Sequence, residues 1–187
     1  ENPLVITAES SFDTWYSGNI NNIIDGDENT HAWHNGEEAA GQYYQVNFSK
    51  PSTVYGVHIL NGANQSGKAQ DTFGKAKVKY KVSGEDTWKD LTDKEYGPYA
   101  ERVDVSGIEI ENVVAVRYEC TQKGSGNKWP SMREFKVSTT PETGVEFTKE
   151  VIRTQDGWAP YQGEESNLID ENTQTSIWYN VRQNGNP

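Results

Sequence analysis

The sequence predicts an all-β sandwich, and two observations lead to this fold class. Short runs rich in Val, Tyr, Ile and Phe alternate with polar residues, and clusters of Gly, Asn, Ser, Asp and Pro separate these runs. Long helical periodicity is hard to find. Antiparallel sheets with one buried and one solvent-facing side produce such alternation. At 187 residues, the chain can bury the core of one substantial domain and still have a segment to spare.

Six runs have the alternation of strands, and one short segment has the spacing of a helical turn. The predicted strands are residues 43–48, 53–60, 75–83, 101–106, 113–121 and 133–139. In the third run every second residue from Lys75 to Lys81 is a lysine, which indicates a strand with one side in water. The helical turn is INNIIDG at 20–26, whose isoleucines would cover an end of the sandwich.

Charge and composition exclude several classes of partner. The formal net charge is -11, with 17 Lys and Arg against 28 Asp and Glu, which disfavours nucleic acids and anionic membranes. We expect no membrane insertion, because no apolar run approaches spanning length. The single cysteine, Cys120, excludes an intrachain disulfide, and its alternation with Val116 and Tyr118 indicates a buried structural thiol.

An incomplete second copy of the module is predicted near the end of the chain. The stretch TTPETG at 139–144 has the composition of a linker. Beyond it, NLIDENTQTSIW at 167–178 aligns without gaps on NIIDGDENTHAW at 22–33. We therefore predict a module at 1–140, a linker at 141–144 and the N-terminal part of a truncated second copy at 145–187.

The segment 22–36 concentrates oxygen-bearing side chains in what we expect to be a tight loop. Asp25, Asp27 and Thr30 offer the mixture of carboxylate, hydroxyl and backbone oxygens that calcium takes in proteins. An EF-hand is excluded, because that motif requires glycine where Thr30 stands and glutamate where Gly36 stands. An Asp-Gly turn with an Asx-type hydrogen bond and no ion is the open alternative.

Zinc is disfavoured in the same segment. His31 and His34 are three residues apart, and the sequence supplies no further ligands beside them. The third histidine, His58, falls inside a predicted strand.

An ordered series of motifs resembles the F5/8 type C, or discoidin-like, superfamily. The series is an apolar pair, DGD, a threonine and a tryptophan at 23–33, then GQYYQVNF at 41–48, then NKWPSMREFKV at 127–137. Within that superfamily, residues 2–140 are most similar to family 32 carbohydrate-binding modules, and especially to the tandem modules of clostridial hexosaminidase- and hyaluronidase-type toxins. The resemblance implies a galactose-binding-domain-like β-sandwich jelly roll with a structural calcium.

The resemblance also implies a set of calcium ligands. In that set the ion ties the first loop to the last strand of the module, which is a structural role. The implied ligands are the Asn22 carbonyl, the Asp25 carboxylate, Asp27, the Thr30 carbonyl and hydroxyl, the Arg133 carbonyl and the Glu134 carboxylate.

A sugar site is expected where loops gather at one end of the sandwich. Sugars present apolar C–H faces and a rim of hydroxyls, so their sites combine an exposed aromatic platform with polar groups. Trp129 is the strongest candidate, because it precedes a proline in a turn rich in Gly, Ser and Asn. The family resemblance implies Asn127 beside it. The other candidates are Asp13, Trp15 and Tyr16 from the first loop, and His34 and Asn35 from the second.

Three other residues are expected to take no part in sugar binding. Trp33 is predicted to pack in the core, since large aromatic side chains dominate such cores. Glu37 and Glu38 are predicted to be solvated, because adjacent carboxylates cannot flank a glycosidic bond as a catalytic pair.

The middle loop, NGANQSGKAQDTF, lacks the arginine that galactose-binding family members use, which favours an N-acetylglucosamine-containing glycan.

These observations favour a non-catalytic carbohydrate-binding module. We expect a secreted protein excised from a larger glycoside hydrolase, which it directs to terminal N-acetylglucosamine, galactose or N-acetylgalactosamine of host glycans. Its partners would be those glycans and the neighbouring modules of its polypeptide. The alternatives are a discoidin-type adhesion domain that binds phospholipid or protein, and an enzyme, for which no nucleophile and base stand at usable spacing.

Overall fold

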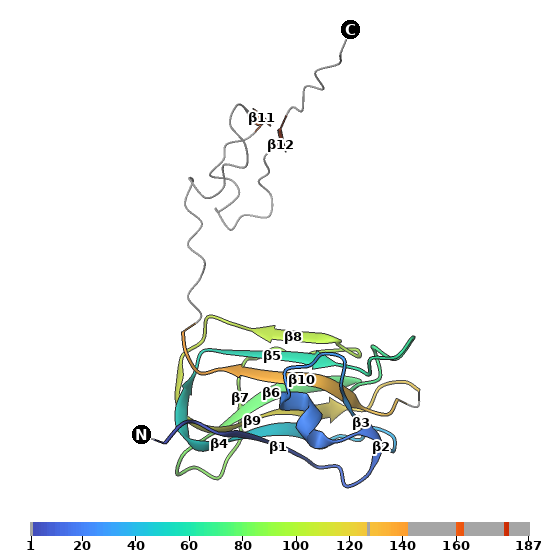
Figure 1. Ribbon diagram of the computed structural model, residues 1–187, viewed down its shortest axis with the longest axis horizontal. Helices are drawn as coiled ribbons and strands as arrows, with labels where there is room; N and C mark the ends of the chain where they lie inside the picture. The colour runs from blue at the N-terminus through green and yellow to red at the C-terminus, as the bar shows by residue number, and fades with distance from the viewer. Residues whose placement is uncertain (1, 127, 142–159, 163–177, 180–187) are drawn as a thin grey trace. The chain divides into compact units, whose positions relative to one another are not determined.

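The computed structural model describes residues 2–126, 128–141, 160–162 and 178–179 (Figure 1). The chain divides into two compact units, Glu1–Glu142 and Thr143–Pro187. In the second unit, β11 (Pro160–Gln162) pairs with the antiparallel β12 (Trp178–Tyr179). Of the predicted repeat at 167–178, residues 167–177 lie outside the described residues, as does most of the linker at 141–144. Among the residues that are described, no helix is long and apolar enough to cross a membrane.

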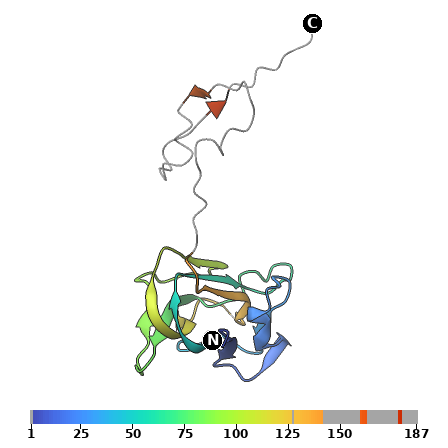
Figure 2. The ribbon, with the colours of Figure 1, turned by 60° about the vertical axis from the view of Figure 1, so that its left-hand side comes forward.

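The first unit is a sandwich of two five-stranded antiparallel sheets (Figures 1 and 2). The first sheet has, in spatial order, β1 (Ile6–Ser10), β4 (Tyr43–Val54), β9 (Ile110–Gln122), β6 (Lys75–Val82) and β7 (Lys89–Asp90). The second has β2 (Trp15–Gly18), β3 (Ala32–His34), β10 (Ser131–Ser138), β5 (Gly56–Asn61) and β8 (Arg102–Val105). The predicted all-β sandwich is confirmed.

Tyr44 and Tyr118, both fully buried, are among the largest side chains of the core. The Tyr44 hydroxyl donates to the carbonyls of Ala32 and Pro130, at 3.2 and 2.8 Å. These contacts link the first sheet to β3 and to the residue before β10 in the second sheet. Burial raises the pKa of Tyr44 well above its ordinary value. Cys120 is buried as predicted, and burial, followed by the nearby charge of Glu38, raises its pKa to about 12.

The predicted helical turn is a 3-10 helix, η1 (Ile20–Ile24). Asn19 caps it by accepting a hydrogen bond from the backbone N–H of Asn21. Ile23 is fully buried, and Ile20 and Ile24 pack against the same core, so the turn covers an end of the sandwich as expected.

The predicted boundary between the strands at 43–48 and 53–60 is wrong. Residues 53 and 54 belong to β4, which runs on through Pro51, and β5 begins only at Gly56. Proline cannot donate a hydrogen bond to a strand ladder. The pairing of β4 with β1 ends at Phe48. Pro51 therefore lies in a part of β4 that needs no N–H donor for pairing with β1. The short strands β1, β2, β3 and β7 were not predicted.

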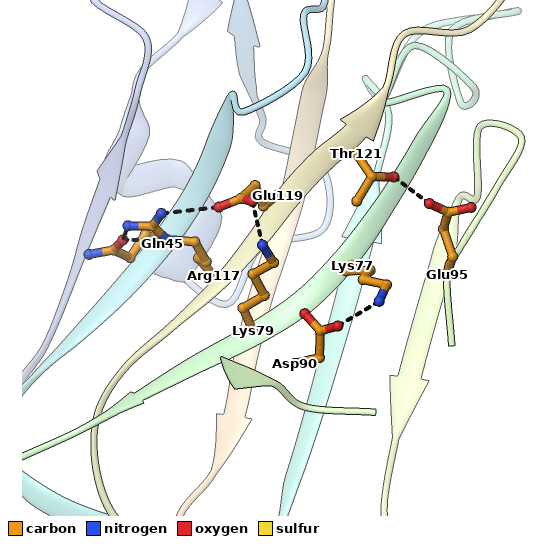
Figure 3. A network of polar contacts seen from close by, with 8 residues as sticks. All are labelled: Gln45, Lys77, Lys79, Asp90, Glu95, Arg117, Glu119 and Thr121. Carbon is orange, nitrogen blue, oxygen red and sulfur yellow. Dashed lines mark hydrogen bonds and ion pairs between the residues drawn. The ribbon is translucent and has the colours of Figure 1, made fainter. Parts of the chain in front are cut away.

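The lysine alternation of β6 has the predicted geometry. Ala76 and Val78 are buried, while the lysines between them lie on the outer face of the first sheet in a network of ion pairs (Figure 3). Each lysine has a carboxylate partner. The pairs are Lys75 with Glu95, Lys77 with Asp90, Lys79 with Glu119 and Lys81 with Asp86.

Candidate functional site

A pocket of about 310 Å³ lies where β2, β3, the loop after β5 and the loop before β10 come together. The strands β2 and β10 both pair with β3, which brings these segments to one end of the second sheet. The lining combines three aromatic rings with an amide, an ammonium and a carboxylate. The lining residues are Tyr16, Trp33, Gln65, Lys68, Asp71 and Trp129.

The aromatic wall follows from the alternation of β2. Trp15 packs toward the core, so Tyr16 points outward and is 59% exposed. Its ring meets those of Trp33 and Trp129 edge to face, with centroids 4.9 and 5.5 Å away. Trp33 Nε1–H donates to the Trp129 carbonyl at 3.0 Å, which fixes one tryptophan against the other. Such a wall suits the apolar C–H face of a ring-shaped ligand.

The polar side of the pocket is built around Asp71. Its side chain is only 5% exposed and contacts two ammonium groups. Lys68 Nζ lies 3.4 Å from Asp71 Oδ2, and Lys128 Nζ donates to Asp71 Oδ1 at 3.2 Å. Lys68 Nζ also lies 5.8 Å from the centroid of the Trp33 ring, so it joins the polar and aromatic sides.

The loop that carries Lys68 and Asp71 is tied to the scaffold at its base. The backbone N–H and the hydroxyl of Ser131 donate to the Asp71 carbonyl, at 2.8 and 2.6 Å. Gly62 has a φ of +83°, and a Cβ there would come within 2.1 Å of the Ala69 carbonyl oxygen. The loop therefore closes tightly on itself, and its two charged residues are held in place.

The structure brings together two of the predicted sugar-binding residues, Trp129 and Tyr16, in this pocket. Trp15 does not line it, because its ring packs against Phe12 and the core. Asp13 and Asn35 are exposed on adjacent loops and do not line the pocket either. Asn127 lies outside the described residues.

His34 does not line the pocket and is 9% exposed. Its ring stacks on that of Phe12 with centroids 4.2 Å apart, and Nδ1 lies 3.1 Å from the Thr14 carbonyl oxygen. The expectation that it faces a ligand is therefore corrected to a packing role. Trp33 is 4% exposed, as predicted for a core residue, yet one part of it lines the pocket.

The prediction that Glu38 is solvated is wrong. Its side chain is buried, 2% exposed, and accepts hydrogen bonds from the backbone N–H groups of Gly74 and Gly124. Two amide donors replace water around the carboxylate, which makes its burial tolerable. Glu37 is exposed and forms an ion pair with Lys123.

Sequence reasoning missed Gln65, Lys68 and Asp71. All three stand in the middle loop, where we looked for an arginine and found none. A lysine three residues before an aspartate in a Gly- and Ser-rich loop was the available signal, and it is too common to be diagnostic without the fold.

The second candidate site is the loop that follows η1. Three oxygens lie within hydrogen-bond range of the Thr30 hydroxyl: Asp25 Oδ2 at 2.8 Å, the Asp27 carbonyl at 3.0 Å and the Asn22 carbonyl at 3.4 Å. One hydroxyl proton cannot satisfy all of them. The Asp27 carboxylate instead accepts from Asn29, so its carbonyl is the oxygen that faces the cluster.

Glu134 brings a second carboxylate to this oxygen cluster. Its Oε1 is buried and has no hydrogen-bond partner. Burial raises the pKa of Glu134 to about 7, and the charge of Asp25 and a hydrogen bond to it act in the same direction. Backbone N–H groups of Gly26 and Asp27 lower the pKa of Glu134. Two facing carboxylates and an orphaned oxygen are what a hard cation would neutralise.

Arg133 lies at an irregularity of β10. The pairing with β5 shifts register between Met132 and Glu134, so Arg133 has no partner in the ladder. Its guanidinium points to Asn61 and Glu101, which leaves the backbone as the part that could serve the oxygen cluster. Within the described residues no three His, Cys, Asp or Glu side chains form a metal-binding group, so an ion here would depend on backbone and hydroxyl oxygens as well.

Comparison with known families adds a match over most of the chain. Residues 5–135 match the family described as F5/8 type C domain. No curated protein sequence matches the chain.

Several solved structures share the fold at low sequence identity. Chitosan-binding module 1 of a chitosanase/glucanase from Paenibacillus sp. IK-5 has 17% identity and a TM-score of 0.56, and the match covers 71% of this chain and 93% of that one. CBM32-1 of a family 31 glycoside hydrolase from Clostridium perfringens has 16% identity and a TM-score of 0.54, over 71% of this chain and 92% of that one. A structure of the CBM32-1, CBM32-2 and M60 catalytic domains of Clostridium perfringens ZmpB has 14% identity and a TM-score of 0.58, over 72% of this chain and 14% of that one.

Proposed function

The chain belongs to the F5/8 type C domain family, and from that premise we propose that the pocket of Tyr16, Trp33 and Trp129 binds a sugar without cleaving it. One observation carries the proposal: three rings form a partly exposed wall beside fixed polar groups, at the loop end of a rigid sandwich. A pyranose would stack its C–H face on the wall and present hydroxyls to Gln65, Lys68 and Asp71.

The pocket is suited to binding and unsuited to glycoside hydrolysis. Hydrolysis needs two carboxyl groups on opposite sides of the scissile bond. Among the residues that line the pocket there is one, Asp71, and two lysines hold it. At about 310 Å³ the pocket is at the small end for ligand sites, so it would hold a single terminal sugar. We propose N-acetylglucosamine, galactose or N-acetylgalactosamine as that sugar.

We propose calcium as a structural ion in the loop after η1. Asp25 and Glu134 would supply carboxylates, Asn22 and Asp27 carbonyls, and Thr30 its hydroxyl and carbonyl, with the Arg133 carbonyl as a further ligand. The orphaned Glu134 oxygen and the surplus of acceptors around Thr30 support this assignment. The ion would neutralise the facing carboxylates and join the start of the module to β10.

The module would serve a larger secreted enzyme. The structures with the same fold include modules from a chitosanase/glucanase and from a family 31 glycoside hydrolase. One small contact of this kind gives weak affinity, and several modules on one polypeptide raise the effective concentration at a glycan surface. We therefore propose an extracellular module that holds a glycoside hydrolase on its substrate.

A glycan-array screen of the full chain beside Trp129→Ala tests the proposal. Removing the indole eliminates one face of the aromatic wall, so binding to terminal sugars should fall at least about tenfold, which corresponds to 1.4 kcal/mol. Trp88→Ala is the matched control, because Trp88 stacks on Arg117 in the first sheet. Equal binding by the wild type and Trp129→Ala would place the sugar elsewhere. Salt-sensitive attachment to liposomes with no glycan binding would instead favour an adhesion domain.

A further inference from the structure

Two lysines converge on one carboxylate at the polar side of the pocket. Lys68 and Lys128 share the single Asp71 carboxylate, and among the described residues it is the one carboxylate that either ammonium contacts. Three other acids near this end of the sandwich make their contacts elsewhere. Glu37 pairs with Lys123, Glu101 pairs with Arg133, and Glu38 is buried under backbone amides. The group formed by Lys68, Lys128 and Asp71 therefore carries one more positive than negative charge, on a chain whose net charge is strongly negative.

Lys68 is the ammonium with spare hydrogen-bonding capacity. An ammonium has three donors. Lys128 makes a hydrogen bond to Asp71, whereas Lys68 approaches Asp71 only at ion-pair distance, 3.4 Å, and its side chain is 46% exposed. Its position over the Trp33 ring places these donors beside the wall on which a sugar ring would stack. A negative group on that sugar would meet Lys68 directly.

We propose that the pocket selects a sugar that carries an anionic substituent, a carboxylate or a sulfate, which Lys68 recognises. The inference rests on the proposed sugar-binding function and names the class of sugar. Lys128 keeps Asp71 neutralised when Lys68 turns to the ligand, so the exchange leaves no carboxylate unpaired. A sugar with a free ammonium group is disfavoured, because Asp71 is already shared by two lysines and both lysines repel the ligand's ammonium.

Calorimetric titration of the full chain with matched monosaccharides tests the inference. The probes are galactose, galacturonic acid, N-acetylglucosamine, sulfated N-acetylglucosamine and glucosamine. We expect the acid or the sulfate ester to bind about fivefold to tenfold more tightly than its neutral parent, as for a hydrogen bond to a charged group, and glucosamine to bind most weakly. The advantage should shrink when salt is raised from about 0.05 to 0.5 M, since charges at an open pocket are screened.

Two variants test whether Lys68, and not another surface lysine, recognises the anionic group. Lys68→Gln should remove the preference for the anionic form, so that an anionic sugar and its neutral parent bind this variant within about twofold of each other. Lys123→Gln is the control, because Lys123 has a carboxylate of its own in Glu37, and it should keep the preference. A preference for galacturonic acid alone would identify a uronate, and a preference for the sulfate alone a sulfated sugar.

The outcomes separate this inference from the function on which it rests. If neutral sugars bind as tightly as both anionic ones, and Trp129→Ala abolishes that binding, the function stands and the charge selection is wrong. A preference that survives in Lys68→Gln would also overturn the assignment to Lys68. If the chain binds none of the five probes and no glycan on the array, both proposals fall.

Discussion

Two carboxylates in this sandwich are each shared by two cations, and the surroundings of the two differ. Glu119, on the outer face of the first sheet, accepts from Lys79 at 2.6 Å and from Arg117 at 3.1 Å (Figure 3). Asp71, at the loop end of the second sheet, contacts Lys68 and Lys128. The number of charges is the same in both places.

The two clusters differ in how far aromatic rings cover one of the two cations, Arg117 in the first sheet and Lys68 at the pocket. The Arg117 guanidinium lies between the rings of Tyr43 and Trp88, 4.0 and 3.6 Å from their centroids, and also donates to Gln45 Oε1. Its donors are used and its faces are occupied, so this cluster is a structural one. At Asp71 the aromatic rings stand beside Lys68 and leave it open to the pocket. A carboxylate shared by two cations is a candidate recognition site where aromatic rings leave one of the cations exposed.

The pair of Asp25 and Glu134 is the inverse case, two anions with no cation among the described residues. Calcium at a hundredfold excess over its dissociation constant should raise the free energy of unfolding by about 2.7 kcal/mol, because the ion binds only the folded cluster. Thermal unfolding with calcium and with a chelator measures this. Glu134→Gln should abolish the response. Identical melting temperatures in calcium and in chelator would refute the calcium site.

The pH dependence of the stability of the calcium-free protein tests the same pair of carboxylates. Glu134 has a pKa of about 7 in the folded chain against an ordinary value of 4.5, so the folded state holds its proton longer than the unfolded state. This group therefore stabilises the folded chain most below about pH 4.5, and that contribution is lost as the pH rises to about 7. Urea unfolding in chelator across this range should show the decline in the wild type and a smaller one in Glu134→Gln.

Removing the shared carboxylate should cost more at Asp71 than at Glu119. Asp71→Asn leaves two lysines beside a nearly buried amide, and we expect the free energy of unfolding to fall by about 1–2 kcal/mol. Glu119→Gln should cost less than about 1 kcal/mol, because Arg117 stays held by its two rings and Gln45. Urea midpoints at constant m-value measure both. If Glu119→Gln cost more than Asp71→Asn, the rings of Tyr43 and Trp88 would not stabilise Arg117 as described.

A similarly small effect is expected for Arg117→Lys. Lysine keeps the charge and loses the planar stack between Tyr43 and Trp88, so the free energy of unfolding should fall by about 1 kcal/mol. Glycan affinity should not change. A loss of glycan binding in this variant, in a chain that still unfolds cooperatively, would move the binding surface to the first sheet.

The strand β6 could be predicted from alternation in the sequence, and the strand β3 could not. The lysine alternation led directly to β6, because each lysine side chain requires solvent while Ala76 and Val78 between them are buried. In β3, by contrast, Ala32, Trp33 and His34 are all buried, so no alternation marks the strand. His34 and Glu38 were misjudged for the same reason: polar residues were assigned to solvent, and packing with hydrogen bonds held them inside.

The candidate site was only half predictable. Tyr16 and Trp129 could be found because exposed aromatic residues stand out in loops rich in small polar residues. Lys68 and Asp71 acquire their meaning from Lys128 and Trp33, which are distant in sequence and meet them only in the folded chain. The convergence of two lysines on one aspartate beside the pocket is thus a property of the fold.

The most direct test of the central claim is an NMR titration of the labelled full chain with its best array ligand. We predict that the indole N–H resonance of Trp129 shifts on binding, together with the backbone amides around Lys68 and Asp71, while the indole resonance of Trp88 and the amide of Arg117 stay in place. Shifts confined to Trp88, Arg117 and their neighbours on the first sheet, with Trp129 unchanged, would contradict the assignment of the pocket as the glycan site.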